Sequence, residues 1–169
     1  MDIRPATAED LEAVTAIYNA GIAEREATFE TRERDADELR EWLTAGPFLV
    51  ATGDGGDVVG FARVGPYSTR EVYRGVGEHG VYVAPEARGN GLGRALLEAI
   101  AQAADAAGLH KLTARIFATN AASLAAHRAA GFTEVGVQRS HARLDGAWRD
   151  VVLVERLLGD AAGVPNSEY

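Results

Sequence analysis

Residues 81–93 have the residue order of a strand, a glycine-rich turn and the start of a helix. They read Val-Tyr-Val-Ala-Pro-Glu-Ala-Arg-Gly-Asn-Gly-Leu-Gly, so a β-branched and aromatic run stops at a proline before an arginine and three alternate glycines. Because glycines carry no side chain, several unpaired N–H groups at such a helix start can converge on an anion. We therefore expect this turn to hold a phosphate or a diphosphate, with a glycine turn that binds no ligand as the alternative interpretation.

Two common nucleotide-binding motifs do not fit this turn. A P-loop ends in Gly-Lys-Ser/Thr, whereas this turn ends in Leu92, Gly93 and Arg94. A dinucleotide fingerprint has Gly-x-Gly-x-x-Gly directly after a strand, whereas these glycines are spaced two and two and begin several residues after Val83. The sequence therefore supports neither a P-loop nor a dinucleotide-binding fold.

The wider pattern resembles motif A of the GNAT superfamily of N-acetyltransferases, which is Arg/Gln-x-x-Gly-x-Gly/Ala after a strand. Residues 88–93 match this motif. A downstream match follows a strand expected at residues 111–117 and consists of Asn120, Ser123, His127 and the Gly-Phe pair at 131–132. In that family the amides of the loop hold the pyrophosphate of acetyl-coenzyme A (acetyl-CoA). The resemblance implies an acetyl-CoA site formed by Val81, Tyr82, Val83, Arg88, Gly89, Asn90, Gly91, Leu92, Gly93, Arg94, Asn120 and Ser123.

Glu78 lies three residues before Val81, on the strand that leads to this turn. Its carboxylate would therefore lie beside a bound thioester. Acetyl transfer needs an uncharged amine, and a base that removes the proton of the amine, directly or through a water, raises the reactive fraction. An unperturbed glutamate is a weak base, so burial or a relaying water must help it. A solvent-facing strand glutamate is the alternative.

The phosphinothricin and methionine sulfone N-acetyltransferases form the GNAT subfamily that this stretch resembles. Their pattern is Tyr-Arg-x-Thr-Val-Glu-x-Ser-Val-Tyr-Val, and its glutamate is the proposed general base. Residues 73–83 retain the glutamate, as Glu78, and the Val-Tyr-Val, but they depart from the pattern at Val76, Gly77 and Gly80. The resemblance implies that Glu78 is the general base.

His127 ends a second pattern of the subfamily, Asn-x-x-Ser-x-x-x-His/Tyr, which begins at Asn120 and includes Ser123. The resemblance implies that His127 protonates the leaving CoA thiolate, with a partly buried structural histidine as the alternative. A thiol with a pKa of about 8.5 leaves without much help, so His127 should matter less than Glu78. Asn120 fits a helix N-cap as well as a hydrogen bond to the pantetheine arm of the cofactor. The N–H of Val81 is the candidate donor to the oxyanion.

Two stretches are candidates for binding the acceptor amine. Phe29 and Glu30 belong to a Thr-Phe-Glu sequence that matches a loop walling the substrate pocket in the subfamily; a core position for Phe29 is the alternative. Arg70, Tyr73 and Arg74 precede the strand of Glu78, and arginine binds a carboxylate or phosphinate with two hydrogen bonds. These five residues are the predicted substrate-binding set, and their arginines favour a small acidic acceptor over a protein.

The bulk composition excludes several other classes of protein. The chain has 169 residues and a net charge of −8, which argues against nucleic acid because its binding depends on clustered Lys and Arg. There is no cysteine, which excludes disulfides, thiolate metal sites and a thiol-acyl intermediate. No signal peptide and no apolar run of spanning length occur, so we expect a cytoplasmic protein without a membrane partner. No metal is expected either, because no metal-ligand spacing relates His79, His110, His127 and His141.

The elements expected along the chain follow the order β-α-α-β-β-β-α-β-α-β-β. GNAT acetyltransferases use this order, which implies an α/β (α+β) fold: a mixed, mostly antiparallel sheet of six to seven strands with helices on both faces. We expect one domain over residues 1–158 and a flexible tail over 159–169. The expected strands cover residues 2–4, 48–52, 58–64, the region of Val81, 111–117, 133–139 and 149–156, with turns at 53–56 and 145–146; the expected helices follow Thr7 and cover 32–44, 92–107 and 121–130.

The resemblance covers residues 2–158 and implies an acetyl-CoA-dependent N-acetyltransferase. Its expected acceptor is a small amino-acid-like amine of the phosphinothricin, methionine sulfone or methionine sulfoximine type, acetylated by direct transfer. A homodimer is expected because the resembled enzymes commonly form one. The alternatives are an acetyltransferase of the same fold that acts on proteins, peptides or other amines, and a non-catalytic acyl-CoA sensor. A sensor could dispense with Glu78 and His127, so their joint presence argues against it.

Overall fold

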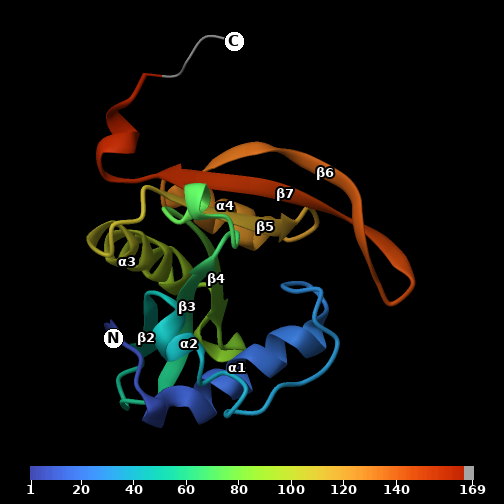
Figure 1. The fold of residues 1–169 in the computed structure, drawn as a ribbon. Coiled ribbons are helices and arrows are strands. Elements are labelled where there is room, and N and C mark those ends of the chain that lie inside the picture. Colours follow the sequence, from blue (N-terminus) through green and yellow to red (C-terminus); the bar gives the residue numbers. More distant parts are fainter. Residues whose placement is uncertain (166–169) are drawn as a thin grey trace.

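A computed structural model describes residues 1–165 and places a seven-stranded sheet at their centre (Figure 1). The strands are β1 (Asp2–Pro5), β2 (Phe48–Thr52), β3 (Val58–Pro66), β4 (Val76–Val83), β5 (Lys111–Phe117), β6 (Thr133–Leu144) and β7 (Ala147–Leu157). Within the described residues their order in the sheet is β1-β2-β3-β4-β5-β7-β6. Only β4 and β5 pair in parallel there, and the other pairs are antiparallel. The predicted mixed, mostly antiparallel sheet is confirmed.

Helices cover both faces of this sheet (Figure 1). They are α1 (Leu11–Glu24), α2 (Trp42–Ala45), α3 (Leu92–Ala106) and α4 (Ala121–Ala129). Alternate residues of the strands face opposite sides, and most of the buried ones belong to two large clusters. Val50 and Phe61 pack with α1 and α2, whereas Ala51 and Ala62 pack with α3 and α4. The predicted layering of helices on both faces is confirmed.

Local capping signals set the ends of the helices. Thr7 forms a capping box at the 3₁₀ turn that leads into α1. Asn120 caps α4, because its side-chain oxygen accepts a hydrogen bond from the N–H of Ser123 at 3.0 Å. Gly108 and Gly131 follow α3 and α4 with φ angles of 84° and 81°, the left-handed conformation that commonly ends a helix. The predicted N-cap at Asn120 is confirmed.

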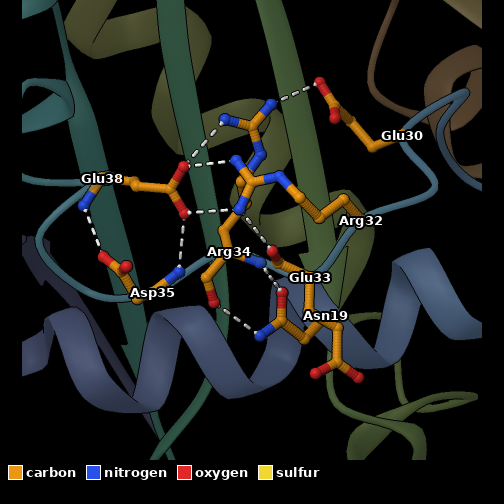
Figure 2. Close-up of polar contacts among 7 residues, drawn as sticks. All are labelled: Asn19, Glu30, Arg32, Glu33, Arg34, Asp35 and Glu38. Carbon is orange, nitrogen blue, oxygen red and sulfur yellow. Dashed lines mark hydrogen bonds and ion pairs between the residues drawn. The ribbon is translucent and has the colours of Figure 1, made fainter.

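The helix predicted at residues 32–44 is wrong for most of its length. Only α2 is helical, and turns precede it. Backbone N–H groups at the start of this segment donate to side chains (Figure 2), and those of Leu39 and Arg40 donate to carbonyls three residues back, as in 3₁₀ turns, instead of four. The Arg34 N–H donates to Oδ1 of Asn19 at 2.9 Å. The N–H groups of Asp35 and Glu38 donate to each other's carboxylates at 3.0 Å.

The last two strands form a hairpin that is longer than predicted. The sequence predicted strands at residues 133–139 and 149–156, whereas β6 and β7 continue to a two-residue turn at Asp145 and Gly146. Both turn residues have positive φ, at 49° and 79°, as the preferred two-residue hairpin turns require. The turn reaches back toward the segment after α1 (Figure 1), where the Asp145 carboxylate lies 3.1 Å from Nε of Arg25.

The segment after β7 begins with a 3₁₀ turn at Gly159–Gly163. The preceding Leu158 is buried in the core. Residues 166–169, which the sequence assigned to a flexible tail, lie outside the described residues. The flexibility of residues 159–169 stays a prediction.

Strands β4 and β5 pair only where residues 76–78 lie beside residues 111–113. Beyond that point β4 continues to Val83 and β5 continues to Phe117, so the two strands diverge. β4 keeps its pairing with β3 as far as Val83. The sheet therefore opens on one side of β4 only, and this opening positions the candidate site.

Candidate active site

A cleft of about 1170 Å³ includes the opening between β4 and β5. Its walls come from the segment after α1, from β3, β4 and β5, from the glycine turn before α3 and from the start of α4. Arg70, Tyr73, Arg74 and Asn90, four residues of the predicted site, are not part of its lining. The predicted site residues that do line it are Phe29, Glu30, Glu78, Val81, Tyr82, Val83, Arg88, Gly89, Gly91, Leu92, Gly93, Arg94, Asn120, Ser123 and His127.

The glycine turn presents backbone N–H groups beside this cleft. Gly89 and Gly91 have φ angles of 81° and 79°, which glycine adopts at little cost. Within residues 1–165, the N–H groups of Gly89, Asn90 and Gly91 have no hydrogen-bond acceptor, and the first N–H groups of α3 have no intrahelical partner. Such donors at the start of a long helix suit a diphosphate. The residues present therefore fit the predicted cofactor.

Arg88 holds the glycine turn in place. Its Nη1 and Nη2 atoms donate to the Glu24 carboxylate at the end of α1, each at 3.0 Å. Its Nε atom donates to the carbonyl of Val83, also at 3.0 Å. Because these nitrogens are engaged, the free donors of the turn are its backbone amides rather than this guanidinium group. Arg94 likewise donates to Glu98, one turn further along α3 and 2.7 Å away.

The backbone of β4 faces the opening. The Ala84 N–H donates to the Val59 carbonyl on β3 at 2.9 Å. Hydrogen-bonding directions alternate along an antiparallel pair, so the N–H groups of Val81 and Val83 point away from β3. An extended pantetheine arm can therefore lie along this edge as a further strand would.

Glu78 lies on the floor of the cleft, at the last position where β4 pairs with β5. Its Oε1 accepts a hydrogen bond from Nη1 of Arg115 on β5 at 2.8 Å. The Glu78 side chain is 40% exposed and that of Arg115 is 33% exposed, so both can be reached from the cleft. The structure thus places the predicted base in the same cleft as the glycine turn.

His127 is buried and its two ring nitrogens are both engaged. Nδ1 lies 2.7 Å from the carbonyl oxygen of Ser123, which only accepts, so Nδ1 carries the proton. Nε2 lies 3.0 Å from Nε2 of His79 on β4, which is also buried. Burial and, to a lesser extent, the proximity of His127 lower the pKa of His79 to about 3, and burial also lowers the pKa of His127. Both rings are therefore neutral near pH 7.

The segment after α1 forms one wall of the cleft. Phe29 packs edge-to-face against Phe117, with ring centroids 4.6 Å apart and the ring planes at 74°. The Glu30 carboxylate accepts a hydrogen bond from Nη2 of Arg34 at 2.9 Å (Figure 2). Phe29 therefore both packs in a small core cluster and lines the cleft. The sequence offered a core position and a position in the pocket wall as alternatives, and Phe29 occupies both.

Asn120 connects this wall to α4. In addition to capping the helix, its side-chain nitrogen donates to the carbonyl of Glu26 at 3.1 Å. Both ends of the Asn120 amide thus have protein partners. The cap is confirmed, and its predicted hydrogen bond to the cofactor stays a prediction.

Arg70, Tyr73 and Arg74 lie in the exposed segment between β3 and β4. The guanidinium carbon of Arg70 lies 5.4 Å from the centre of the Tyr73 ring. Arg74 pairs with Glu71 at 2.5 Å. None of the three side chains lines the cleft, and their role in substrate binding stays a prediction.

Sequence reasoning missed several charged or titratable residues of the cleft, three of which lie on the central strands β3, β4 and β5. These three are Arg63 on β3, His79 on β4 and Arg115 on β5. A basic residue inside an otherwise apolar strand is a signal that could have indicated Arg63 and Arg115. No local signal pairs His79 with His127, because 48 residues separate them along the chain.

Comparisons with known proteins agree with this geometry. A family model described as the acetyltransferase (GNAT) family matches residues 15–132. An L-methionine sulfoximine/L-methionine sulfone acetyltransferase of Pseudomonas paraeruginosa is 35% identical over 96% of this chain and 98% of its own. A phosphinothricin N-acetyltransferase of Streptomyces coelicolor is 36% identical over 94% of this chain and 96% of its own. A crystal structure of a Sinorhizobium meliloti phosphinothricin acetyltransferase in complex with acetyl-CoA has a TM-score of 0.90 and 31% identity, covering 99% of this chain and 93% of that one.

The chain therefore belongs to the GNAT acetyltransferase family. It is an acetyl-CoA-dependent N-acetyltransferase, and the predicted family, fold and co-substrate are confirmed. Among residues 1–165, no cluster of three or more side chains is able to hold a metal ion. In the same part of the chain, no helix combines the length and apolar character needed to cross a membrane.

Proposed function

We propose that this enzyme acetylates the amino group of a small amino-acid-like acceptor of the phosphinothricin, methionine sulfone or methionine sulfoximine type. The observation that carries this proposal is that Glu78 and the glycine turn line one cleft. The names of the relatives, which specify phosphinothricin and methionine sulfoximine or sulfone, support the class of acceptor.

The glycine turn and the free edge of β4 are the proposed cofactor-binding elements. The amides of Gly89 to Gly93 would hold the diphosphate, and the edge at Val81 and Val83 would hold the pantetheine arm. Bound there, acetyl-CoA supplies the acetyl group as a thioester. The N–H of Val81 is proposed to donate to the oxyanion that forms on the carbonyl carbon.

Glu78 is the proposed general base. It takes a proton from the acceptor ammonium, directly or through a water, so that the free amine can attack the acetyl carbon. His127 is the proposed donor of a proton to the leaving thiolate. The neutral ring has only one N–H, which donates to the Ser123 carbonyl, so it can protonate the thiolate only after it has taken up a proton released by the amine. A thiol with a pKa of about 8.5 is also a good leaving group, and the share of His127 in the rate is therefore proposed to be smaller than that of Glu78.

We further propose a single domain over residues 1–158 that forms a homodimer in the cytoplasm. The outer strand β6 exposes Val135 and Val137, and Trp148 beside it on β7 is 57% exposed, which suits a surface covered by a second copy. The charged co-substrate acetyl-CoA supports the cytoplasm as the compartment. Size-exclusion chromatography with light scattering tests the dimer, and a monomer at micromolar concentration would contradict it.

A thiol-release assay with acetyl-CoA tests the proposed reaction. The acceptor panel comprises phosphinothricin, methionine sulfone, methionine sulfoximine, polyamines and short peptides. We expect release of CoA with the amino-acid analogues. Release with peptides alone would favour the alternative of a peptide acetyltransferase. Binding of acetyl-CoA without release for any amine would favour a sensor.

A further inference from the structure

The ion pair between Glu78 and Arg115 consists of a single hydrogen bond. Only Oε1 of Glu78 and Nη1 of Arg115 meet, at 2.8 Å. Within residues 1–165 neither side chain forms another hydrogen bond, which leaves Oε2 of Glu78 and the remaining N–H groups of Arg115 without a protein partner. A half-exposed pair of this kind contributes about 1 kcal/mol or less to stability. Separating the two side chains therefore costs little free energy, and the fold does not depend on their contact.

A second arginine adds positive charge to the same floor. Arg63 on β3 lies opposite Gly80 and therefore faces the same side of the sheet as Glu78. Its guanidinium group stacks over the Trp42 ring, 4.0 Å from the ring centre. Within the described residues, Arg63 forms no ion pair. Arg63 and Arg115 thus lie on the strands either side of Glu78, and all three side chains line the cleft.

This floor is complementary to a zwitterion. The amino and carboxylate groups of an α-amino acid are attached to one carbon atom, so they lie as close together as the two ends of the Glu78–Arg115 pair. A bound α-amino acid can therefore place its ammonium group on Glu78 and its carboxylate on Arg115, where the guanidinium group offers two parallel donors. A simple amine or the N-terminus of a peptide lacks that carboxylate.

We propose that Arg115 is the residue that selects α-amino acids, and that it does so by exchanging Glu78 for the carboxylate of the acceptor. This inference rests on the proposed function, and it deepens that function by assigning the recognition of the substrate class to one side chain. When the exchange occurs, Glu78 loses its cationic partner and both its oxygens become available to the amine.

The proton and the electrons then balance without another reactant. Glu78 accepts one proton from the ammonium group, and the freed lone pair of the nitrogen forms the bond to the acetyl carbon. The carbon–sulfur bond then breaks with its electrons on sulfur, and the second proton that the amide nitrogen loses passes to the thiolate to give the CoA thiol. Arg115 touches the substrate in this scheme without taking part in proton transfer. Its removal should therefore affect acceptor binding and selectivity rather than cofactor binding.

The test compares each acceptor with the same molecule lacking its carboxylate. Methionine sulfone and 3-(methylsulfonyl)propylamine form such a pair, and kcat/KM is measured for both with wild-type enzyme, Arg115→Gln and Arg115→Lys. We expect Arg115→Gln to lower kcat/KM for the amino acid at least about tenfold, the value of a lost charge-assisted contact, and to leave the amine unchanged or faster. Arg115→Lys should restore part of the loss, since it keeps the charge without the planar fork.

A matched control uses an arginine–glutamate pair outside the cleft. Arg128 pairs with Glu134 at 2.6 Å on the exposed side of α4, and Arg128→Gln should leave the ratio of the two substrates unchanged. Isothermal titration of acetyl-CoA checks that the cofactor site is intact in every variant. An equal loss for both substrates, or no loss for the amino acid, would overturn the inference about Arg115. Failure of wild-type enzyme to acetylate methionine sulfone, phosphinothricin or any other amino acid would overturn the proposed function as well.

Discussion

The imidazole Nε2 atoms of His79 and His127 lie 3.0 Å apart, between β4 and α4. Because Nδ1 of His127 donates to the Ser123 carbonyl, its Nε2 must accept, and His79 must be the donor of this contact. Protonation of either ring would place two N–H groups against each other in a buried site. The pair is therefore held neutral, and a link between β4 and α4 depends on that state.

A loss of stability in mild acid follows from this pair. Both histidines have folded-state pKa values lowered from 6.5, that of His79 to about 3, so the unfolded chain takes up protons first as the pH falls. The contribution of the neutral histidines to the free energy of unfolding should be fully present above about pH 6.5. Below that pH the free energy of unfolding should decrease by up to about 1.4 kcal/mol per pH unit for each histidine. Urea unfolding between about pH 7 and pH 5, above the range in which carboxylates titrate, measures this slope.

Two variants separate this pair from the rest of the protein. His79→Gln keeps an N–H donor toward His127 but cannot titrate, and its stability should depend less steeply on pH. His110→Gln replaces an exposed histidine and should retain the wild-type slope. Equal slopes for wild-type protein and His79→Gln would show that the pair does not control acid stability.

Gly91 should be sensitive to substitution and Gly93 should not. Gly91 has a φ of 79°, which costs an L-residue about 1–2 kcal/mol, and the turn that presents the amides depends on it. Gly93 lies inside α3, and a Cβ there would meet only Val83, at an ordinary contact distance of 3.9 Å. Gly91→Ala should therefore weaken acetyl-CoA binding about tenfold or more, while Gly93→Ala binds normally. Isothermal titration makes the comparison, and indistinguishable affinities would refute the role of the left-handed turn.

The two hydrogen bonds of Asn120 can be tested separately. Asn120→Ala removes the α4 cap and should lower the free energy of unfolding by about 1 kcal/mol. Asn120→Asp keeps an acceptor for the Ser123 N–H but cannot donate to the Glu26 carbonyl. It should retain most of the stability while raising KM for the acceptor, because the wall after α1 loses its tie to α4. A stability loss as large as that of Asn120→Ala would assign the main contribution to the Glu26 contact.

The elements that a short stretch of sequence determines were predicted well. β5 coincides with the predicted strand, and the glycine turn, the start of α3 and the N-cap of α4 are as expected. Each depends on neighbouring residues, such as glycines at positive φ or an asparagine before a helix. The helix prediction for residues 32–44 was wrong although the spacing of its apolar and charged residues fits a helix. Asp35 and Glu38 instead form hydrogen bonds between backbone and side chain within a local turn.

The partners of the site residues could not be predicted in the same way. Glu78 meets Arg115 only because β4 and β5 are parallel neighbours joined through α3, so the contact spans 37 residues. His79 on β4 likewise meets His127 on α4, a contact that spans 48 residues. Single-sequence periodicity indicates strands and helices, but it does not give the register between strands that are distant in the chain.

The central claim is that Glu78 removes the proton of the acceptor in a cleft that binds acetyl-CoA independently. Glu78→Gln tests it most directly, because glutamine keeps the shape and an acceptor for Arg115 but cannot take up a proton. We predict that kcat falls by about 10²–10⁴-fold while the dissociation constant for acetyl-CoA is unchanged. A kcat near that of the wild type, with methionine sulfone or phosphinothricin as acceptor, would contradict the account.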